Sequence, residues 1–118
     1  MTTPPTIPCN KWDVILVPFK FTDTDTLKPR PAVVVSVDQF HASRADAIML
    51  AVTSQAGRLY FGDCTIVDWQ AAGLVKPSQA KGVLRTIERS LIHRWLGTLT
   101  PADCQRVEQS LRLIMGLP

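Results

Sequence analysis

The sequence has few of the residues on which most enzyme active sites are built. It contains two histidines, and its three cysteines, Cys9, Cys64 and Cys104, are far apart. An odd number of separated cysteines argues against a disulfide scaffold, and their spacing matches no zinc-ligand motif. Glycine-rich phosphate loops, the His-Glu-x-x-His motif and the Gly-x-Ser-x-Gly motif are also missing. We therefore expect reduced thiols, no bound metal and no cofactor.

Long apolar runs are missing as well. No stretch reaches the roughly 18 uncharged apolar residues of a transmembrane helix, and residues 1–10 have threonine and proline where a signal peptide has an apolar core. We expect a soluble cytoplasmic protein without a membrane span. The formal net charge of +3 slightly favours a polyanionic partner. Because the basic residues are spread along the chain, a positively charged groove has to be assembled by folding.

Length and composition fit one compact domain. With 118 residues, 46% of them apolar and 19% charged, the chain can bury one core and is too short for two ordinary domains. We expect residues 1–10 to be a flexible lead-in and residues 11–118 to form the domain. Short runs rich in β-branched and aromatic residues predict strands. The predicted strands are 12–19, 31–37, 45–53, 58–61, 64–67, 82–87 and 92–96, with a turn at 88–90 and one helical turn at 68–72.

The clearest local pattern predicts a helix near residue 118. Thr100 is a capping residue, Pro101 suits the first helical position, and Asp103 lies near the positive end of the helix dipole. An apolar stripe at steps of three or four residues follows, and Gly116 ends the helix. The stripe consists of Cys104, Val107, Leu111, Ile114 and Met115. The predicted fold is therefore mainly β, a small barrel with short helices onto which this amphipathic helix packs.

Arg30 is the first candidate for chemistry, because it stands between two prolines at the mouth of a predicted strand. Pro29 and Pro31 restrict the backbone on both sides. A guanidinium held in this way is pre-positioned to donate two hydrogen bonds to a phosphate and to stabilise charge that develops during a reaction. The alternative is an arginine that closes the end of the barrel by binding carbonyl groups or a carboxylate.

Thr53, Ser54 and Gln55 form a second candidate cluster where another predicted strand ends. Their neutral hydrogen-bonding groups suit a phosphate or a 2′-hydroxyl, and capping of the strand end is the alternative. A two-histidine ribonuclease site made by His41 and His93 is a less favoured hypothesis, because the two histidines stand in unlike sequence contexts.

Five blocks of the sequence together resemble the MazF/PemK family of toxins from bacterial toxin-antitoxin systems. They are WDVILVPFKFTD, KPRPAVVVSVDQF, AVTSQ, AGLVKPS and ERSLIHRWLGTLTPADCQRVEQSLRLIMGL, and the similarity spans residues 11–117. The resemblance implies an SH3-like β-barrel of the MazF/CcdB type with a C-terminal helix, and a homodimer. It also implies metal-independent, sequence-selective endoribonuclease cleavage of single-stranded mRNA to 2′,3′-cyclic phosphate and 5′-hydroxyl ends, which inhibits translation and growth. A cognate antitoxin protein with an acidic tail is the other partner that it implies.

The resemblance assigns roles to individual residues. Arg30 takes the place of the family arginine that acts in acid/base catalysis and on the phosphate, and Thr53 that of the threonine that stabilises the phosphate. Residues 20–29 are expected to form a variable wall of the RNA groove, with lysines facing phosphates and Phe21 stacking on a base. The expected RNA-binding residues are Lys20, Phe21, Lys28, Ser54, Gln55, Lys76 and Arg85.

One position departs from the family pattern. Members usually have Gly-Asp at the first strand, where this chain has Trp12 and Asp13. Three interpretations are open: the indole narrows the RNA groove, it stacks on a base, or it packs in the core or an interface, which is the favoured interpretation.

Two other functions compete with the nuclease. One is a non-nucleolytic toxin like CcdB, which binds DNA gyrase, and the other is a degenerate member that binds nucleic acid without cutting it. The fold alone does not separate these functions. The motifs around Arg30 and Thr53 favour the endoribonuclease.

Overall fold

The computed structural model describes residues 7–18, 28–54 and 57–118. These residues form a mainly β fold, as predicted. In chain order the elements are β1 (Asp13–Pro18), β2 (Pro29–Val34), α1 (Asp38–Ser43), β3 (Asp46–Thr53), β4 (Cys64–Ile66), β5 (Ser78–Glu88), the 3-10 helix η1 (Arg89–Leu91), β6 (Arg94–Thr98) and α2 (Pro101–Met115).

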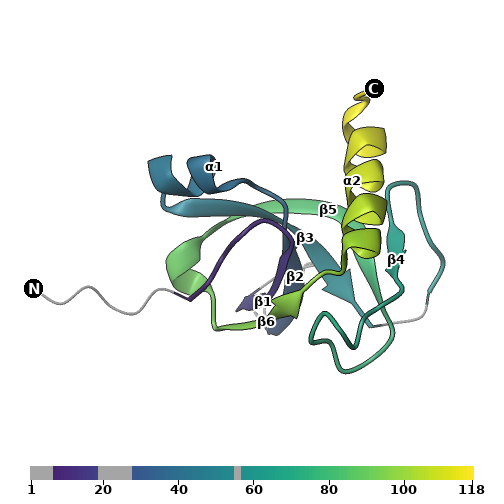
Figure 1. The fold of residues 1–118 in the computed structure, drawn as a ribbon, viewed down its shortest axis with the longest axis horizontal. Helices are drawn as coiled ribbons and strands as arrows, with labels where there is room; N and C mark the ends of the chain where they lie inside the picture. The colour runs from purple at the N-terminus through teal and green to yellow at the C-terminus, as the bar shows by residue number, and fades with distance from the viewer. Residues whose placement is uncertain (1–6, 19–27, 55–56) are drawn as a thin grey trace, which may run out of the picture.

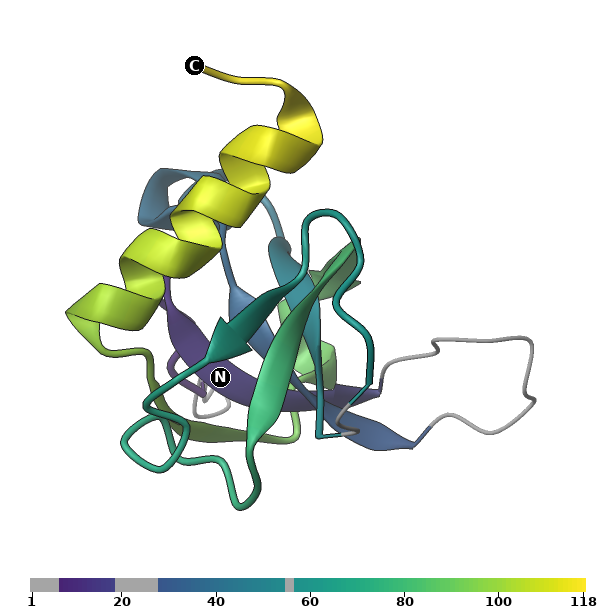
Figure 2. The ribbon, with the colours of Figure 1, turned by 90° about the vertical axis from the view of Figure 1, so that its right-hand side faces the viewer.

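The strands form one antiparallel sheet in the order β4-β5-β3-β2-β1-β6. The sheet is curled into a half-barrel, with α2 along one side and α1 at the opposite end (Figures 1 and 2). β1 lies between β2 and β6, so that Val14 pairs with Gly97. The long strand β5 pairs with β3 and, at its start, also with β4. A register shift between Leu50 and Val52 of β3 supports the curl, because irregularities of this kind bend a strand.

Apolar side chains cover both faces of the central strands. Along β1, Val14 belongs to one buried cluster, and Ile15 and Val17 belong to another, which reflects the two-residue period of a strand. The cluster of Val14 also contains Val107 of α2, so the helix covers that face. Burial on both faces explains the nearly continuous apolar runs of β2 and β3. Each fully buried valine stabilises the fold by about 1.5 kcal/mol or more.

Asp103 fastens α2 to the rest of the domain. Its side chain is fully buried and accepts hydrogen bonds from the backbone N–H groups of Val67 at 3.0 Å and Asp68 at 2.8 Å. Arg106 donates to the same carboxylate at 2.7 Å. The helix begins after Thr100, whose hydroxyl accepts from the Asp103 N–H at 3.4 Å. The Thr100 hydroxyl therefore caps the helix, and the Asp103 carboxylate holds the segment that follows β4.

Most predicted elements are confirmed, with shifted ends. The predicted C-terminal helix is α2, and its last turn ends at Gly116, which has a left-handed φ of 65°. Of the predicted apolar stripe, Val107 is buried, whereas Met115 is 60% exposed. The strands expected at 31–37, 82–87 and 92–96 are found at Pro29–Val34, Ser78–Glu88 and Arg94–Thr98.

One local prediction is wrong, and one short helix was missed. Residues 58–61 form no strand. The Tyr60 N–H donates to the Asp63 carboxylate and the Asp63 N–H donates to the Tyr60 carbonyl, so this segment forms a turn. The predicted helical turn at 68–72 is confirmed, because the Ala72 N–H donates to the Asp68 carbonyl at 3.2 Å and the turn ends at Gly73, whose φ is +84°. The short helix α1 was not predicted, because Val37 at its N-cap position provides no side-chain cap.

Part of the predicted lead-in packs on the domain. Ile7 and the buried Cys9 contact the core cluster of β1 and β2, while residues 1–6 lie outside the described residues. No helix within the described ranges is long and apolar enough to cross a membrane.

Candidate active site

Arg30 and Thr53 come together at one end of the sheet. The pairing of β2 with β3 ends at Ala32 and Ala51, and Arg30 and Thr53 are each two residues beyond this pair, so the alternation of a strand puts them on the same face. Side chains at opposed positions of antiparallel strands have Cβ atoms about 4.5–5.5 Å apart. Both residues line the same surface hollow. The two motifs that sequence analysis selected separately are therefore neighbours in the fold.

This hollow, named here the phosphate hollow, has a volume of about 300 Å³. Arg30 and Thr53 lie at strand ends, Ser54 directly follows β3, Lys76 precedes β5, and Ser78 is the first residue of β5. The complete lining is Pro29, Arg30, Pro31, Val52, Thr53, Ser54, Leu74, Val75, Lys76 and Ser78. It contains two cations and no carboxylate, so among the described residues its charge favours an anion such as a phosphodiester.

The strand pairing explains how Arg30 is held. It pairs with Val17 of β1, between Pro29, which pairs with Pro18, and Pro31, which pairs with Leu16. The backbone of Arg30 is thus fixed by its prolines and by the sheet, and its partly buried side chain lies in the phosphate hollow. A guanidinium fixed in this way loses little further freedom when it binds phosphate.

The other predicted RNA-binding residues do not all meet at this place. Lys20, Phe21 and Gln55 lie outside the described residues. Lys28 is exposed two residues before Arg30. Arg85 pairs with Met49 and is six residues along β5 from the position opposite Thr53, a separation of about 20 Å. Arg85 is therefore not part of the phosphate hollow.

Ser78 was missed by the sequence analysis, although it belongs to the AGLVKPS block. It is buried, lines the phosphate hollow and donates a hydrogen bond to the Lys76 carbonyl at 2.7 Å. This bond bends the segment back on itself just before β5 begins. The bend places Lys76 on the rim of the hollow.

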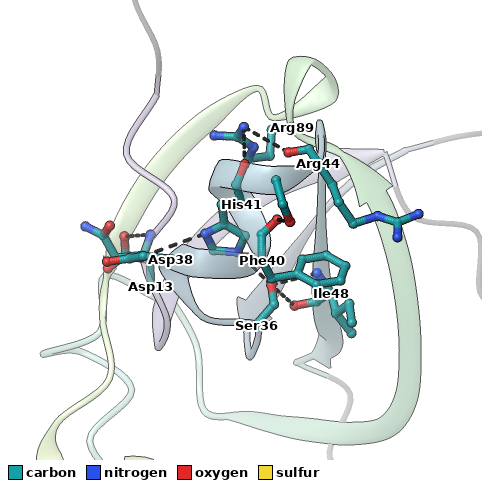
Figure 3. A network of polar contacts seen from close by, with 10 residues as sticks. Asp13, Ser36, Asp38, Phe40, His41, Arg44, Ile48 and Arg89 are labelled. Atoms are coloured by element: carbon teal, nitrogen blue, oxygen red, sulfur yellow. Dashed lines mark hydrogen bonds and ion pairs between the residues drawn. The ribbon is translucent and has the colours of Figure 1, made fainter.

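The two histidines make no joint site. His41 is buried in α1, with its Nε2 atom 2.6 Å from the Ser36 Oγ (Figure 3). Burial lowers the pKa of His41, the Arg89 charge lowers it further, and Asp38 only partly opposes them. The Ile48 N–H donates to the Ser36 Oγ at 2.9 Å. This network ties α1 to β3, and neither histidine lines the phosphate hollow, so the two-histidine hypothesis has no support in this arrangement.

A family model of the PemK-like, MazF-like toxins of type II toxin-antitoxin systems matches residues 10–115. The chain belongs to this family. The MazF/PemK resemblance inferred from the sequence is thereby confirmed.

Solved structures share the MazF/PemK fold at low sequence identity. An endoribonuclease bound to its cognate antitoxin, from a mycobacterial species, has a TM-score of 0.74 at 16% identity, over 92% of this chain and 96% of that chain. MazF from Deinococcus radiodurans has a TM-score of 0.74 at 19% identity, over 96% and 100%. The Mycobacterium tuberculosis toxin MazF-mt6 has a TM-score of 0.71 at 16% identity, over 90% and 98%.

Trp12, which replaces the usual MazF/PemK glycine, has a left-handed backbone with φ of 77°. Its N–H donates to the Val34 carbonyl at 2.7 Å, and its carbonyl accepts from the Leu99 N–H at 3.0 Å. Its ring packs on the core cluster under α2, with the Lys11 Nζ 4.8 Å from the ring centre. The favoured interpretation, a tryptophan packed on the core, agrees with these contacts. The backbone geometry also gives a conformational reason for glycine at this position.

Proposed function

We propose that this toxin is an endoribonuclease that cuts single-stranded RNA at the phosphate hollow. The observation that carries the proposal is that Arg30 and Thr53 share a hollow which the described residues line with two cations and no carboxylate. The 2′-hydroxyl oxygen attacks the adjacent phosphorus and the bond to the 5′-oxygen breaks. The products are a 2′,3′-cyclic phosphate and a 5′-hydroxyl, and the proton lost by the 2′-oxygen is balanced by the one gained at the 5′-oxygen.

In this proposal Arg30 binds the non-bridging phosphate oxygens and stabilises the charge that grows on them. An arginine titrates far above neutral pH, so this electrostatic role is the main one we assign to it. The Thr53 hydroxyl donates to the same phosphate group, and Ser54 and Lys76 hold the neighbouring backbone. Lys20, Phe21, Lys28, Gln55 and Arg85 stay in the proposal as RNA contacts on sequence grounds.

The test is cleavage of a long single-stranded RNA in the presence of EDTA. Removal of a single donor to a developing anion costs about 3 kcal/mol, a hundredfold or more in rate, so Arg30→Ala should cut at least a hundred times more slowly. Thr53→Ala should lose about tenfold. The matched controls are Arg112→Ala and Thr86→Ala, which alter exposed residues outside the phosphate hollow.

Full activity of both Arg30→Ala and Thr53→Ala would remove this site from the proposal. RNA that is retained without turnover by the unaltered protein would indicate the degenerate binding protein instead. Stable capture of gyrase without any RNA cleavage would indicate the CcdB-like function.

We also propose a cognate antitoxin and a homodimer. Structures of relatives include an endoribonuclease with its cognate antitoxin and a MazE-MazF complex, and the net charge of +3 suits an acidic antitoxin segment. Purification together with the product of a neighbouring small gene tests this partner. Failure of that product to bind, or to protect cells from the toxin, would contradict it.

The aromatic loop, residues 57–63, is the surface that we assign to the second copy. Tyr60 and Phe61 are 65% and 77% exposed, an unusual exposure for two adjacent aromatic rings. The loop is well held, because Asp63 accepts from the Tyr60 N–H at 2.9 Å and the Gly82 N–H at 2.7 Å and pairs with Lys81. Light scattering should find a dimer that Phe61→Glu dissociates, whereas Val37→Glu, at the α1 end, leaves it intact. A dimer that survives Phe61→Glu would exclude this surface.

A further inference from the structure

Gln79 lies in the same cross-strand row as Thr53. It is opposite Thr53 of β3 on one side and opposite Thr65 of β4 on the other. Neighbouring strands are about 4.8 Å apart, so Gln79 is one strand away from the proposed catalytic threonine. The row brings its amide next to the phosphate hollow without placing it inside that hollow.

Among the described residues, one half of the Gln79 amide has no partner. Its Nε2 donates to the Gly57 carbonyl at 3.1 Å, whereas its Oε1 is enclosed and accepts no hydrogen bond from this part of the chain. Enclosed acceptors in proteins are nearly always satisfied, and leaving one unpaired costs free energy. An acceptor left in this state points to a ligand that supplies the missing N–H.

Gln79 also lines a second hollow, named here the base hollow. Its volume is about 310 Å³, at the lower end of the range for small-molecule sites. Ile66, Val67, Trp69 and Pro77 provide apolar walls, and an indole is a surface on which nucleobases stack. An apolar hollow with one orienting amide has the composition of a ligand site.

The base hollow adjoins the phosphate hollow, because Ser78 lines both. A nucleotide whose phosphate lies in the phosphate hollow therefore has a second hollow within reach for a base. We propose that the base hollow binds one base of the RNA next to the cut, and that Gln79 selects a base with an exocyclic amino group. This proposal rests on the proposed ribonuclease function.

Base chemistry explains the selection. Adenine, cytosine and guanine each carry an exocyclic amino group that donates N–H, whereas uracil carries carbonyl oxygens at its exocyclic positions and a single ring N–H that lies between them. One N–H of the Gln79 Nε2 is bound to Gly57, so the oxygen is the part of this amide whose hydrogen-bonding capacity is wholly unused. The last side-chain torsion of glutamine is soft, so a small turn of the amide brings that oxygen to the hollow. An exocyclic amino group then reaches it directly, whereas the uracil ring N–H brings its two flanking carbonyl oxygens toward the glutamine oxygen, and these repel it.

The test is cleavage of an RNA library with randomised positions around the cut, followed by sequencing of the products. The unaltered protein should disfavour uracil about tenfold at one position, the size of effect expected for one lost hydrogen bond and one unpaired acceptor. Gln79→Met, which keeps the length of the side chain, should lose this preference and keep the preferences at other positions. Gln70→Met, an exposed change away from both hollows, is the matched control. An unchanged preference in Gln79→Met overturns the proposal.

If the unaltered protein cuts no RNA, the ribonuclease proposal is contradicted, but the base hollow is not. A measurement of nucleotide binding then tests the base hollow directly. The indole N–H resonance of Trp69, identified with Trp69→Phe, is followed by NMR during titration with AMP, CMP or UMP. AMP and CMP should shift it at concentrations about tenfold lower than UMP does, and Gln79→Met should abolish the difference. Equal shifts with the three nucleotides, or no shift with any of them, would refute the base hollow.

Discussion

Trp12 allows the conformational cost of replacing a glycine to be measured. Its φ of 77° is imposed from both sides, because its N–H and its carbonyl are bound to β2 and to the start of the α2 segment. Replacement by alanine removes the indole and keeps the strain, whereas replacement by glycine removes both. The difference between the two variants therefore isolates the backbone term.

The magnitude follows from two opposing effects. A residue with a Cβ in the left-handed region costs about 1–2 kcal/mol, and the freer unfolded chain of glycine gives back about 0.4–1 kcal/mol. Trp12→Gly should therefore be more stable than Trp12→Ala by about 0.5–1 kcal/mol, or roughly 2–6 °C in Tm. Both variants should be less stable than the natural protein, because the indole packs on the core.

Urea unfolding followed by circular dichroism measures the difference. Lys11→Ala and Lys11→Gly form the control pair, because Lys11 has no positive φ and there glycine should be the less stable residue, as it usually is. If glycine is no better than alanine at position 12, the left-handed backbone of Trp12 carries no cost and the reasoning fails.

Three further outcomes are expected. Asp103→Ala should lower the free energy of unfolding by about 2–4 kcal/mol, because it leaves the backbone N–H groups of Val67 and Asp68 without their acceptor and removes the partner of the half-exposed Arg106; a loss below about 1 kcal/mol in urea unfolding would contradict this role of Asp103. Gly97→Ala should fold poorly, because its Cβ would overlap the Ala72 carbonyl, and a soluble variant with unchanged Tm would disprove that close approach. Since burial lowers the pKa of His41 from its ordinary 6.5, the unfolded chain takes up the proton first, so stability should be constant above pH 6.5 and fall as the pH drops from 6.5 toward the lowered pKa. His41→Gln should remove this part of the pH dependence of Tm, and a slope that persists in this variant would assign it to another group.

The sequence predicted an element correctly where a single local pattern, such as a helix cap or an apolar run, determines it. Thr100, Pro101 and Gly116 mark the ends of α2 through capping and the left-handed terminus, and the structure keeps these ends. The β-branched runs of β1 to β3 were found for a similar reason, because strands buried on both faces read as continuous apolar segments. Helix α1 has no such mark, because nothing in the side chain of Val37 caps it.

The candidate site was half visible in the sequence. The Arg30 and Thr53 motifs could be selected from the sequence by their chemistry. Their proximity depends on the register of β2 against β3, which no local sequence pattern predicts. Gln79 carried no motif at all. The role that we propose for it comes from its place opposite Thr53 and from an amide oxygen without a partner among the described residues, and both are properties of the folded chain.

The pairing of β1 with β6 also bears on how the toxin is made. Val14 and Gly97 are more than eighty residues apart in the chain. During synthesis β1 therefore cannot pair with β6 until most of the chain has been made. A chain released early would leave an open edge on β1, the strand that pairs with Arg30, and open edges invite aggregation and degradation. Incomplete translation products of this toxin should therefore be cleared by proteases without harming the cell that makes them.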